Sequence, residues 1–396
     1  MFEPKHTLQE LKMRQALPLD AKISMTKLRI KQWIQEFGIN GVYVSFSGGK
    51  DSTVLLHICR ELYPEIKAMF IDTGLEYPEI RDFVRTFDNV DIIRPTLTFK
   101  QVIDKYGYPF ISKEVAETVA GARQYLTELA AENTIIKAGR QAGRQAGNTI
   151  NISTTNYAAF VDMLRERMKN RAGGNNERLL ILLGQMPTNP TAGAFPKKSI
   201  YNCEKYQFFI NAPFEISNRC CYVMKKAPAH KYGKETGRVP ILATMAAESR
   251  LRTQKWIQNG CNAFDAKKPT STPLSFWTEN DILQYIKREG LTICKVYGDI
   301  VPDYDGEQLA GQMDFADLGL IEDNRKLKTT GCTRTGCMFC GFGCHLEKAG
   351  DGRFERMKQT HPKQYDYIMR PKERGGLDYK TVIDWINENG GLNIRY

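Results

Sequence analysis

Short apolar runs alternate with amphipathic stretches over the first hundred residues of the chain. Three runs are rich in β-branched and aromatic residues, as buried parallel strands are: 42–46, 66–71 and 90–93. Apolar residues recur at helical spacing in the stretches before and between them: 25–37, 53–57, 78–87 and 98–105. Strands that alternate with helices predict an α/β fold with a doubly wound parallel sheet and right-handed crossovers.

The pattern changes after residue 112 and becomes helical, with glycine-rich interruptions. We expect helices over 113–131 and 160–171, and between them lies a tandem Ala-Gly-Arg-Gln repeat at 138–145. Glycine at that density weakens a helix. This basic segment is therefore predicted to be a loop, which either is solvated or contacts a nucleic acid. We interpret residues 112–200 as a helical insertion.

A further strand over 239–245 and two later helices complete the pattern. Thr278 is a candidate N-cap for the first helix, with Asp281 three residues on, and the second helix spans 378–387. The section between them is predicted to be loop-rich, apart from a solvated amphipathic helix near 353–361. We expect three parts: an N-terminal extension (1–23), a main α/β domain with the insertion (24–270) and a C-terminal cysteine-rich section (271–396).

Composition and charge narrow the class of protein. The 396 residues are 42% hydrophobic and 26% charged, which is ordinary for a globular protein. A net charge of +11 suits a polyanionic ligand, such as a nucleotide or a nucleic acid, as well as a basic surface without a ligand. With no apolar stretch of about 18 residues and no apolar signal core, we expect a cytoplasmic protein without a membrane partner. Ten cysteines in a reducing compartment favour metal or redox chemistry over disulfides.

The stretch Ser47–Ser52, Ser-Gly-Gly-Lys-Asp-Ser, joins the first strand to the helix that follows. In this geometry backbone N–H groups and a helix N-terminus face an anion, and glycines let the backbone come close to it. The residues predicted to bind a phosphate-bearing cofactor here are Ser45, Ser47, Gly48, Gly49, Lys50, Asp51 and Ser52. The stretch resembles the pyrophosphate loop of the adenine-nucleotide alpha-hydrolase superfamily, which implies an adenosine nucleotide as the ligand.

Two more polar clusters follow strands and are expected at the same edge of the sheet, because ligands of parallel sheets bind beyond the carboxyl ends of the strands. Asp72, Thr73 and Gly74 follow the second strand and are suited to hydrogen-bonding adenine or ribose. Arg250 and Arg252 follow a later strand, and planar guanidinium groups are suited to sulfate or phosphate oxygens. A capped turn and a surface ion-pair network are the alternative interpretations of the two clusters.

The order of these motifs is similar to that in the phosphoadenylyl-sulfate (PAPS) and adenylyl-sulfate reductases of the same superfamily. The motifs are the loop at 47–52, the turn at 72–74, the pair Cys220-Cys221 before a basic helix, 248–252 and 273–282. The resemblance implies a doubly wound sheet that binds an adenosine nucleotide, with arginine-containing loops around the phosphosulfate. The chain departs from the family in its long insertion and in lacking a C-terminal Glu-Cys-Gly-Leu-His segment, which carries the nucleophile in that family.

The nearest counterpart of that missing segment is Cys344-His345. A thiolate at Cys344 would attack sulfur, with His345 lowering the pKa of the thiol. The candidate catalytic residues are Lys50, Arg250, Arg252 and Cys344.

A group of cysteines near the C-terminal end predicts a metal centre, and its members are Cys332, Cys337, Cys340 and Cys344. The spacing of Cys337 and Cys340 lets two thiolates bind one metal centre. In one scheme the four form a local site for zinc or an iron–sulfur cluster. In the other, which resembles adenylyl-sulfate reductases, Cys220 and Cys221 join that pair around a four-iron cluster, and the other two are spare thiols or a replacement ligand. We prefer the second scheme and keep zinc as the alternative.

Three functions fit these motifs. The first is a PAPS reductase-like enzyme that transfers the sulfo group of PAPS or adenylyl sulfate to a thiolate, with a thioredoxin-like electron donor. The second is an ATP pyrophosphatase that binds ATP with Mg²⁺ and adenylates an acceptor for thiolation by a sulfur donor, as in DNA phosphorothioation or tRNA thiolation. The third is a nucleotide or redox sensor without catalysis. A nucleic acid and a second copy of the chain are further expected partners.

Overall fold

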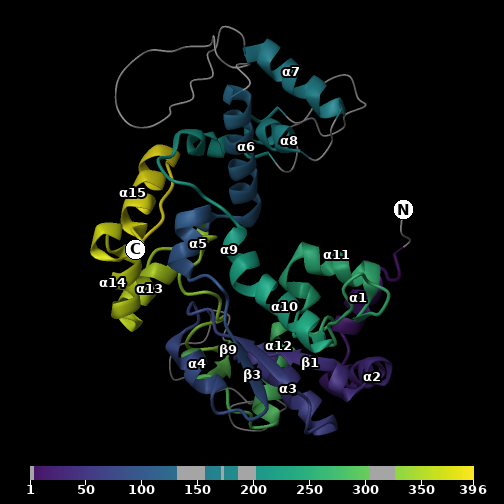
Figure 1. Ribbon diagram of the computed structural model, residues 1–396. Coiled ribbons are helices and arrows are strands. Elements are labelled where there is room, and N and C mark those ends of the chain that lie inside the picture. Colours follow the sequence, from purple (N-terminus) through teal and green to yellow (C-terminus); the bar gives the residue numbers. More distant parts are fainter. Residues whose placement is uncertain (1–3, 132–156, 171–173, 186–201, 304–325) are drawn as a thin grey trace. The chain divides into compact units, whose positions relative to one another are not determined.

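The computed structural model describes residues 4–131, 157–170, 174–185, 202–303 and 326–396 (Figure 1). The chain divides into two compact units, each discontinuous in sequence. The first unit comprises Met1–Thr96 and Lys225–Cys337, and the second comprises Leu97–Met224 and Met338–Tyr396. The tandem repeat at 138–145 lies outside the described residues. The three-part division expected from the sequence stays a prediction.

A six-stranded sheet organises the first unit, in the order β3-β2-β1-β5-β7-β6. Its strands are β1 (Val42–Ser45), β2 (Ala68–Ile71), β3 (Val90–Ile93), β5 (Val239–Ile241), β6 (Asn262–Ala263) and β7 (Thr270–Ser271). Neighbouring strands run parallel except for β6 and β7, and Val44 of β1 pairs with Ala68 on one side and Ile241 on the other. The predicted α/β fold with a parallel sheet is confirmed, although β5 is shorter than the predicted 239–245.

Helices cover both faces of this sheet, as a doubly wound fold requires. Val44 and Phe46 point into the larger core, whereas Tyr43 points to the opposite face and packs against Tyr232. This alternation arises because successive side chains of a strand point to opposite faces. The helices that pack in the larger core are α2 (Leu19–Phe37), α3 (Lys50–Leu62), α4 (Pro78–Val84) and α12 (Glu279–Arg288). Tyr232 belongs to α10 (Ala227–Thr236), which covers the opposite face.

Helix α2 begins earlier than the sequence pattern predicts. It starts at Leu19 rather than near residue 25, and its first turns bury Lys22. The ammonium of Lys22 lies 2.7 Å from Asp281 Oδ2 of α12, so an ion pair ties the two helices together. Asp281 also accepts a hydrogen bond of 2.6 Å from the backbone N–H of Thr278, which confirms the predicted N-cap.

The remaining elements of the first unit are short. They are α1 (Leu8–Gln15), η1 (Ile39–Gly41), η5 (Ala246–Glu248), α11 (Arg250–Asn259), η6 (Lys295–Tyr297), β8 (Ile300–Pro302) and β9 (Leu327–Thr329). A π-helical turn, η4 (Tyr222–Lys226), leads into α10. No helix within the described residues combines the length and the apolar character that a membrane span needs.

The second unit is mostly helical. Its elements include α5 (Phe99–Tyr106), α6 (Lys113–Ala131), α7 (Tyr157–Asn170), α8 (Asn175–Leu182), η3 (Glu204–Asn211), α9 (Arg219–Cys221), η7 (Cys344–Leu346), α13 (Arg353–Thr360), α14 (Pro362–Met369), η8 (Lys372–Arg374) and α15 (Tyr379–Gly390). Two short strands, β4 (Phe110–Ile111) and β10 (Gly341–Phe342), pair in parallel.

Aromatic side chains form much of the interior of the second unit. Tyr379 is fully buried, and its ring contacts those of Tyr108, Phe110 and Phe354. The helix predicted near 353–361 is present as α13, but it is not merely a solvated helix, because it buries Phe354. The pattern did not predict α14.

Candidate nucleotide site

The loop after β1 has the strand–turn–helix geometry predicted from its sequence. Gly48 has a φ of +70°, and a Cβ there would come within 2.8 Å of Ile80 and Val84. Only glycine fits such a position without strain or overlap. Ser52 Oγ donates to Gly49 O at 2.9 Å and accepts from the backbone N–H of Ser47 at 3.1 Å, which holds the turn closed.

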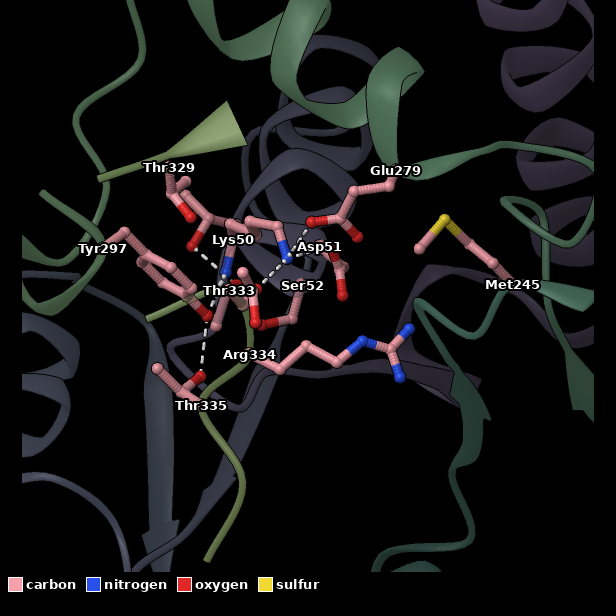
Figure 2. A network of polar contacts seen from close by, with 12 residues as sticks. Lys50, Asp51, Ser52, Met245, Glu279, Tyr297, Thr329, Thr333, Arg334 and Thr335 are labelled. Atoms are coloured by element: carbon pink, nitrogen blue, oxygen red, sulfur yellow. Dashed lines mark hydrogen bonds and ion pairs between the residues drawn. The ribbon is translucent and has the colours of Figure 1, made fainter. Parts of the chain in front are cut away.

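Lys50 lies inside the protein rather than on the open side of the loop (Figure 2). Its side chain is only 1% exposed, and its ammonium lies 2.8 Å from Glu279 Oε1 and donates to Thr333 O at 2.9 Å. Burial alone would lower the pKa of Lys50, but the Asp51 and Glu279 carboxylates outweigh burial and raise that pKa. The loop lysine is therefore a buried, paired cation. The sequence pattern contained an indication of this burial, because Lys50 lies four residues before the buried Val54, on the same face of the helix.

Asp51 carries a carboxylate oxygen that is incompletely satisfied. Oδ1 is buried and has no hydrogen-bond partner among the described residues, and Lys50 Nζ lies 3.5 Å away, which is long for a hydrogen bond. Burial raises the pKa of Asp51, Lys50 and Arg334 oppose the rise, and Glu279 adds to it. A buried carboxylate oxygen beside a phosphate-binding loop suits Mg²⁺, which proteins hold through one or two carboxylates and the phosphates of the substrate.

A segment far along the chain closes over the loop, and we name Thr333–Gly336 the strap. The hydroxyl of Tyr297 accepts a hydrogen bond from the backbone N–H of Lys50 at 3.1 Å and lies 2.7 Å from Thr335 Oγ1 (Figure 2). A Cβ at Gly49 would come within 3.2 Å of both oxygens. The strap therefore packs directly against the backbone of the loop. No local pattern along the chain had indicated this contact.

The predicted arginines occupy two different environments. Arg252 of α11 pairs with Glu248, which also lies 3.0 Å from Arg334 of the strap. Burial and the Arg334 charge lower the pKa of Arg252, and Asp51 opposes them, so the guanidinium lies within the electrostatic reach of the loop. Arg250 is exposed. Neither Arg250 nor Arg252 lines the pocket described below.

The polar residues predicted in the turn after β2 make contacts within the protein. Asp72 is nearly buried, and its carboxylate lies 3.3 Å from Arg81 Nε and 3.2 Å from Arg94 Nε. Thr73 donates from its backbone N–H at 3.1 Å and from its hydroxyl at 2.7 Å to the carboxylate of Glu76. Gly74 has a φ of +74° within this turn. The turn therefore holds Asp72 and Thr73 in internal contacts.

A pocket of about 850 Å³ opens between α10 and the sheet face that carries Tyr43. Ser45 and Ser47, both predicted from the sequence, line it where β1 enters the loop. Aromatic and apolar side chains form its floor, and Tyr77 and the strap also contribute to the lining. The floor residues are Tyr43, Met69 and Ile71. A concave site with an apolar floor and a few polar groups is typical of a small-molecule pocket.

The predicted metal-binding cysteines are divided between the two units. In the first unit, the Cys332 thiol donates to Tyr77 OH at 3.6 Å, and Cys337 ends the unit. In the second unit, Cys220, Cys340 and Cys344 lie near the buried phenol of Tyr379. Burial raises the pKa of Tyr379, and the charges of these three cysteines raise it further. Cys221 follows in the same unit. Among the described residues, no three thiol, imidazole or carboxylate groups stand at metal-binding spacing.

Cys344 lies in surroundings that keep its thiol protonated. Burial raises its pKa to about 12 despite the nearby Arg353. The thiol donates to Gly341 O at 2.8 Å. Cysteine thiolates are the preferred ligands of iron–sulfur clusters and zinc, so the donor chemistry of the cysteine set fits either group.

Comparisons with known proteins identify a family for this chain. A family model described as the phosphoadenosine phosphosulfate reductase domain matches residues 41–137 and 192–341, which is more than half of the chain. An uncharacterised protein of Methanocaldococcus jannaschii, MJ0973, is 35% identical over 72 residues, which cover 17% of this chain and 18% of that protein. The crystal structure of PAPS reductase from Candida auris in a phosphate complex covers 74% of this chain and 92% of its own, with 10% identity and a TM-score of 0.32. The family match, with the loop and pocket in place, shows that this chain belongs to the phosphoadenosine phosphosulfate reductase domain family.

Proposed function

We propose that the pocket binds an adenosine nucleotide and that the chain is a PAPS reductase-like enzyme that acts on sulfonucleotides. The observation that supports the proposal most directly is the pocket itself, which begins at Ser47 of the loop and continues over an apolar floor. In our proposal the adenosine lies on Tyr43 and Met69. The phosphate-bearing end faces Ser47 and the first N–H groups of α3, where a helix N-terminus attracts anions.

The reductase form of the proposal requires a thiolate that reaches the sulfur of PAPS or adenylyl sulfate. The thiolate attacks sulfur, the sulfur–oxygen bond breaks, and the nucleotide leaves as its phosphate with the electron pair. A second thiolate then displaces sulfite, and the two thiols become a disulfide. The protonated Cys344 is poorly suited to the first attack. We therefore assign both thiols to a thioredoxin-like donor, and the positive pocket stabilises the leaving phosphate.

The family resemblance implies a cysteine-held cluster close to this reaction. In our proposal Cys220, Cys221, Cys337 and Cys340 hold an iron–sulfur cluster, with zinc as the alternative, and Cys332 or Cys344 is a replacement ligand. When bound, an iron–sulfur cluster would supply one-electron redox chemistry, whereas zinc would supply structural support.

Two observations support a second candidate function, an ATP pyrophosphatase that adenylates an acceptor for thiolation. None of the described residues that line the pocket is a cysteine. The buried Oδ1 of Asp51 also suits Mg²⁺, which ATP requires. In this reaction an acceptor oxygen attacks the α-phosphorus of ATP, the bond to the β-phosphate breaks, and pyrophosphate leaves.

One experiment separates these candidates. The purified protein, prepared without oxygen, is mixed with PAPS and a dithiol, with adenylyl sulfate and a dithiol, and with ATP and Mg²⁺. Sulfite from either of the first two mixtures supports the reductase, whereas pyrophosphate from ATP without sulfite supports the pyrophosphatase. Nucleotide binding without turnover supports a sensor. If Ser47→Ala binds nucleotide as the parent does, while the control Ser24→Ala also does, the pocket assignment is wrong.

Metal content tests the ligand scheme separately. A brown protein with broad visible absorbance contains a cluster, whereas a colourless protein with stoichiometric zinc excludes it. Cys220→Ser loses metal and Cys332→Ser keeps it if the preferred scheme holds. The opposite result supports the local scheme.

A further inference from the structure

The rim of the pocket is strongly positive, because the lining contains far more cationic side chains than carboxylates. Among the described residues that line it are six lysines and one arginine, with Glu76 as the one carboxylate. We name these cations the cationic rim: Lys225, Lys226, Lys234, Arg238, Lys255, Lys267 and Lys268. Glu76 is already engaged, because the Thr73 hydroxyl donates to it at 2.7 Å.

The cationic rim is assembled from separate parts of the first unit. Four of its members come from η4, α10 and the residue that precedes β5, one comes from α11, and two come from the loop between β6 and β7. All six lysines are exposed. The rim is therefore not the solvated face of a single helix, because the fold brings distant lysines to one pocket.

His230 of α10 shows how crowded these charges are. Its imidazole Nε2 lies 3.2 Å from Lys268 Nζ. Burial lowers the pKa of His230, and the charges of Lys268 and Lys226 lower it further. The cations gathered around this one pocket repel one another, and an anion bound among them relieves the repulsion.

A single mononucleotide leaves part of the rim unused. Arg238 of the rim already has a partner, because its Nη1 lies 3.9 Å from Asp91 Oδ2. A nucleotide with two phosphates and a sulfate, or with three phosphates, carries roughly four negative charges, which is fewer than the six lysines of the rim. The volume of about 850 Å³ also lies in the upper part of the range for one small ligand. The remaining cations therefore suit a second, extended anion beside the nucleotide.

We propose that the cationic rim binds the phosphodiester backbone of a single-stranded nucleic acid beside the nucleotide pocket. Proteins that bind single strands combine a positive groove along the backbone with aromatic rings on which bases stack, and here the partly exposed Tyr77 lines the same concavity. A duplex, with its bases paired inside, gains nothing from that ring. The inference rests on the proposed function only in placing a nucleotide on the pocket floor.

The test measures strand affinity in a rim variant and in a charge-matched control. The rim variant replaces four lysines by alanine, at Lys225, Lys226, Lys267 and Lys268. The control replaces four exposed lysines of the same unit that do not line the pocket, Lys12, Lys31, Lys287 and Lys326. Fluorescence anisotropy with labelled single strands of DNA or RNA, and with the matching duplex, is recorded over a range of salt. The adenosine nucleotide 3′-phosphoadenosine 5′-phosphate is present throughout.

The rim variant should bind the single strand at least about tenfold more weakly, with a logarithmic salt slope smaller by about 3, because each backbone contact to a single strand adds about 0.7 to that slope. The control should stay within about twofold of the parent protein. A third variant with arginine at the four rim positions should retain binding, which excludes misfolding as the cause. If either single strand binds more tightly than the matching duplex, the proposal is supported. Comparison of the two single strands then shows whether the rim prefers DNA or RNA.

Three results would overturn the proposal: no strand binding by the parent protein at low salt, equal losses in the rim variant and the control, or a duplex that binds as tightly as the single strand. Calorimetric titration with 3′-phosphoadenosine 5′-phosphate separates this inference from the proposed function. Nucleotide binding without strand binding rejects the inference alone. Strand binding without nucleotide binding rejects the proposed function and leaves the rim assignment in place.

Discussion

Asp51 illustrates how a residue that is predicted to bind the nucleotide costs stability. Its carboxylate is only 24% exposed, and burial raises its pKa, so the folded state disfavours the charged form that prevails at neutral pH. Asp51→Asn removes that charge. We expect the variant to be more stable than the parent protein at neutral pH by about 1 kcal/mol, while it loses Mg²⁺-dependent nucleotide affinity.

The sign of this effect follows from the direction of the pKa shift. As pH falls through the raised pKa of Asp51 toward the ordinary value of 3.8, the parent protein takes up a proton more readily when folded and gains stability. The advantage of the variant therefore shrinks in acid. Urea unfolding at several pH values measures it, and Asp265→Asn, at a carboxylate that is 89% exposed, should show no such change. A variant that is less stable at neutral pH would contradict this account.

Glu279 is the partner that keeps the Lys50 ammonium charged inside the protein. Glu279→Gln should destabilise the first unit by about 1–2 kcal/mol, less than the loss expected for a fully buried pair, because the Glu279 side chain is 43% exposed. The pKa of Lys50 is raised in the folded state, so the contribution of the pair is present below the ordinary value of 10.5 and is lost as pH rises through the folded pKa.

The difference in unfolding free energy between parent and Glu279→Gln should therefore be constant from about pH 7 to 9 and decrease in stronger alkali. Glu36→Gln, at an exposed residue of the same unit, serves as the control. A difference that grows in alkali would show that Glu279 does not act through Lys50.

The loop between β1 and α3 depends on Gly48 more than on its other glycines. Gly48→Ala combines a left-handed φ with overlap against Ile80 and Val84, so we expect a loss of about 2–4 kcal/mol. Gly74→Ala has nearly the same φ, but a Cβ there would meet open space, and its expected cost is only about 1 kcal/mol. Thermal unfolding of the two variants compares them. Equal losses would mean that packing against α4 does not constrain the loop.

At the level of elements, local patterns predicted the glycine turn but not what covers it. Two glycines between a strand and a helix determine that geometry within a few residues, and the structure has it. The contact of Lys50 with Thr333 joins residues 283 positions apart, and no local periodicity contains such information. The ion pair of Asp72 with Arg94 was not predicted for the same reason, because Arg94 follows a different strand. Lys22 was missed because a lysine within a helix start resembles a solvated residue, and only Asp281 allows its burial.

At the level of the whole molecule, the strand–helix alternation was sufficient to predict the parallel sheet, but not how the chain divides. Both compact units combine an early and a late segment. Hydrophobic periodicity describes each element separately and does not state which distant elements share a core. The cationic rim was likewise visible only as a net charge of +11 until the fold placed its members around one pocket.

Nucleotide binding should protect one unit more than the other. With 3′-phosphoadenosine 5′-phosphate at about 100 times its dissociation constant, the binding-competent state gains about 2.7 kcal/mol. Hydrogen exchange should slow in β1, β2 and α10, which carry residues that line the pocket. Exchange in α15 of the second unit serves as the internal control and should change little. Protection centred on α15 would place the ligand elsewhere.

The burial of Lys50 also sets the order in which the protein can be completed during synthesis. β1 and α3 leave the ribosome early, but Glu279, Thr333 and the neighbouring strand β5 are made much later. Until then the loop lysine has neither of those partners and keeps its hydration, and the sheet lacks the strand beside β1. Contacts of such high sequence separation are slow to form. The loop that is translated first is therefore among the last parts of the molecule to reach its final structure, and the nascent chain exposes an unpaired edge of β1 for most of its translation.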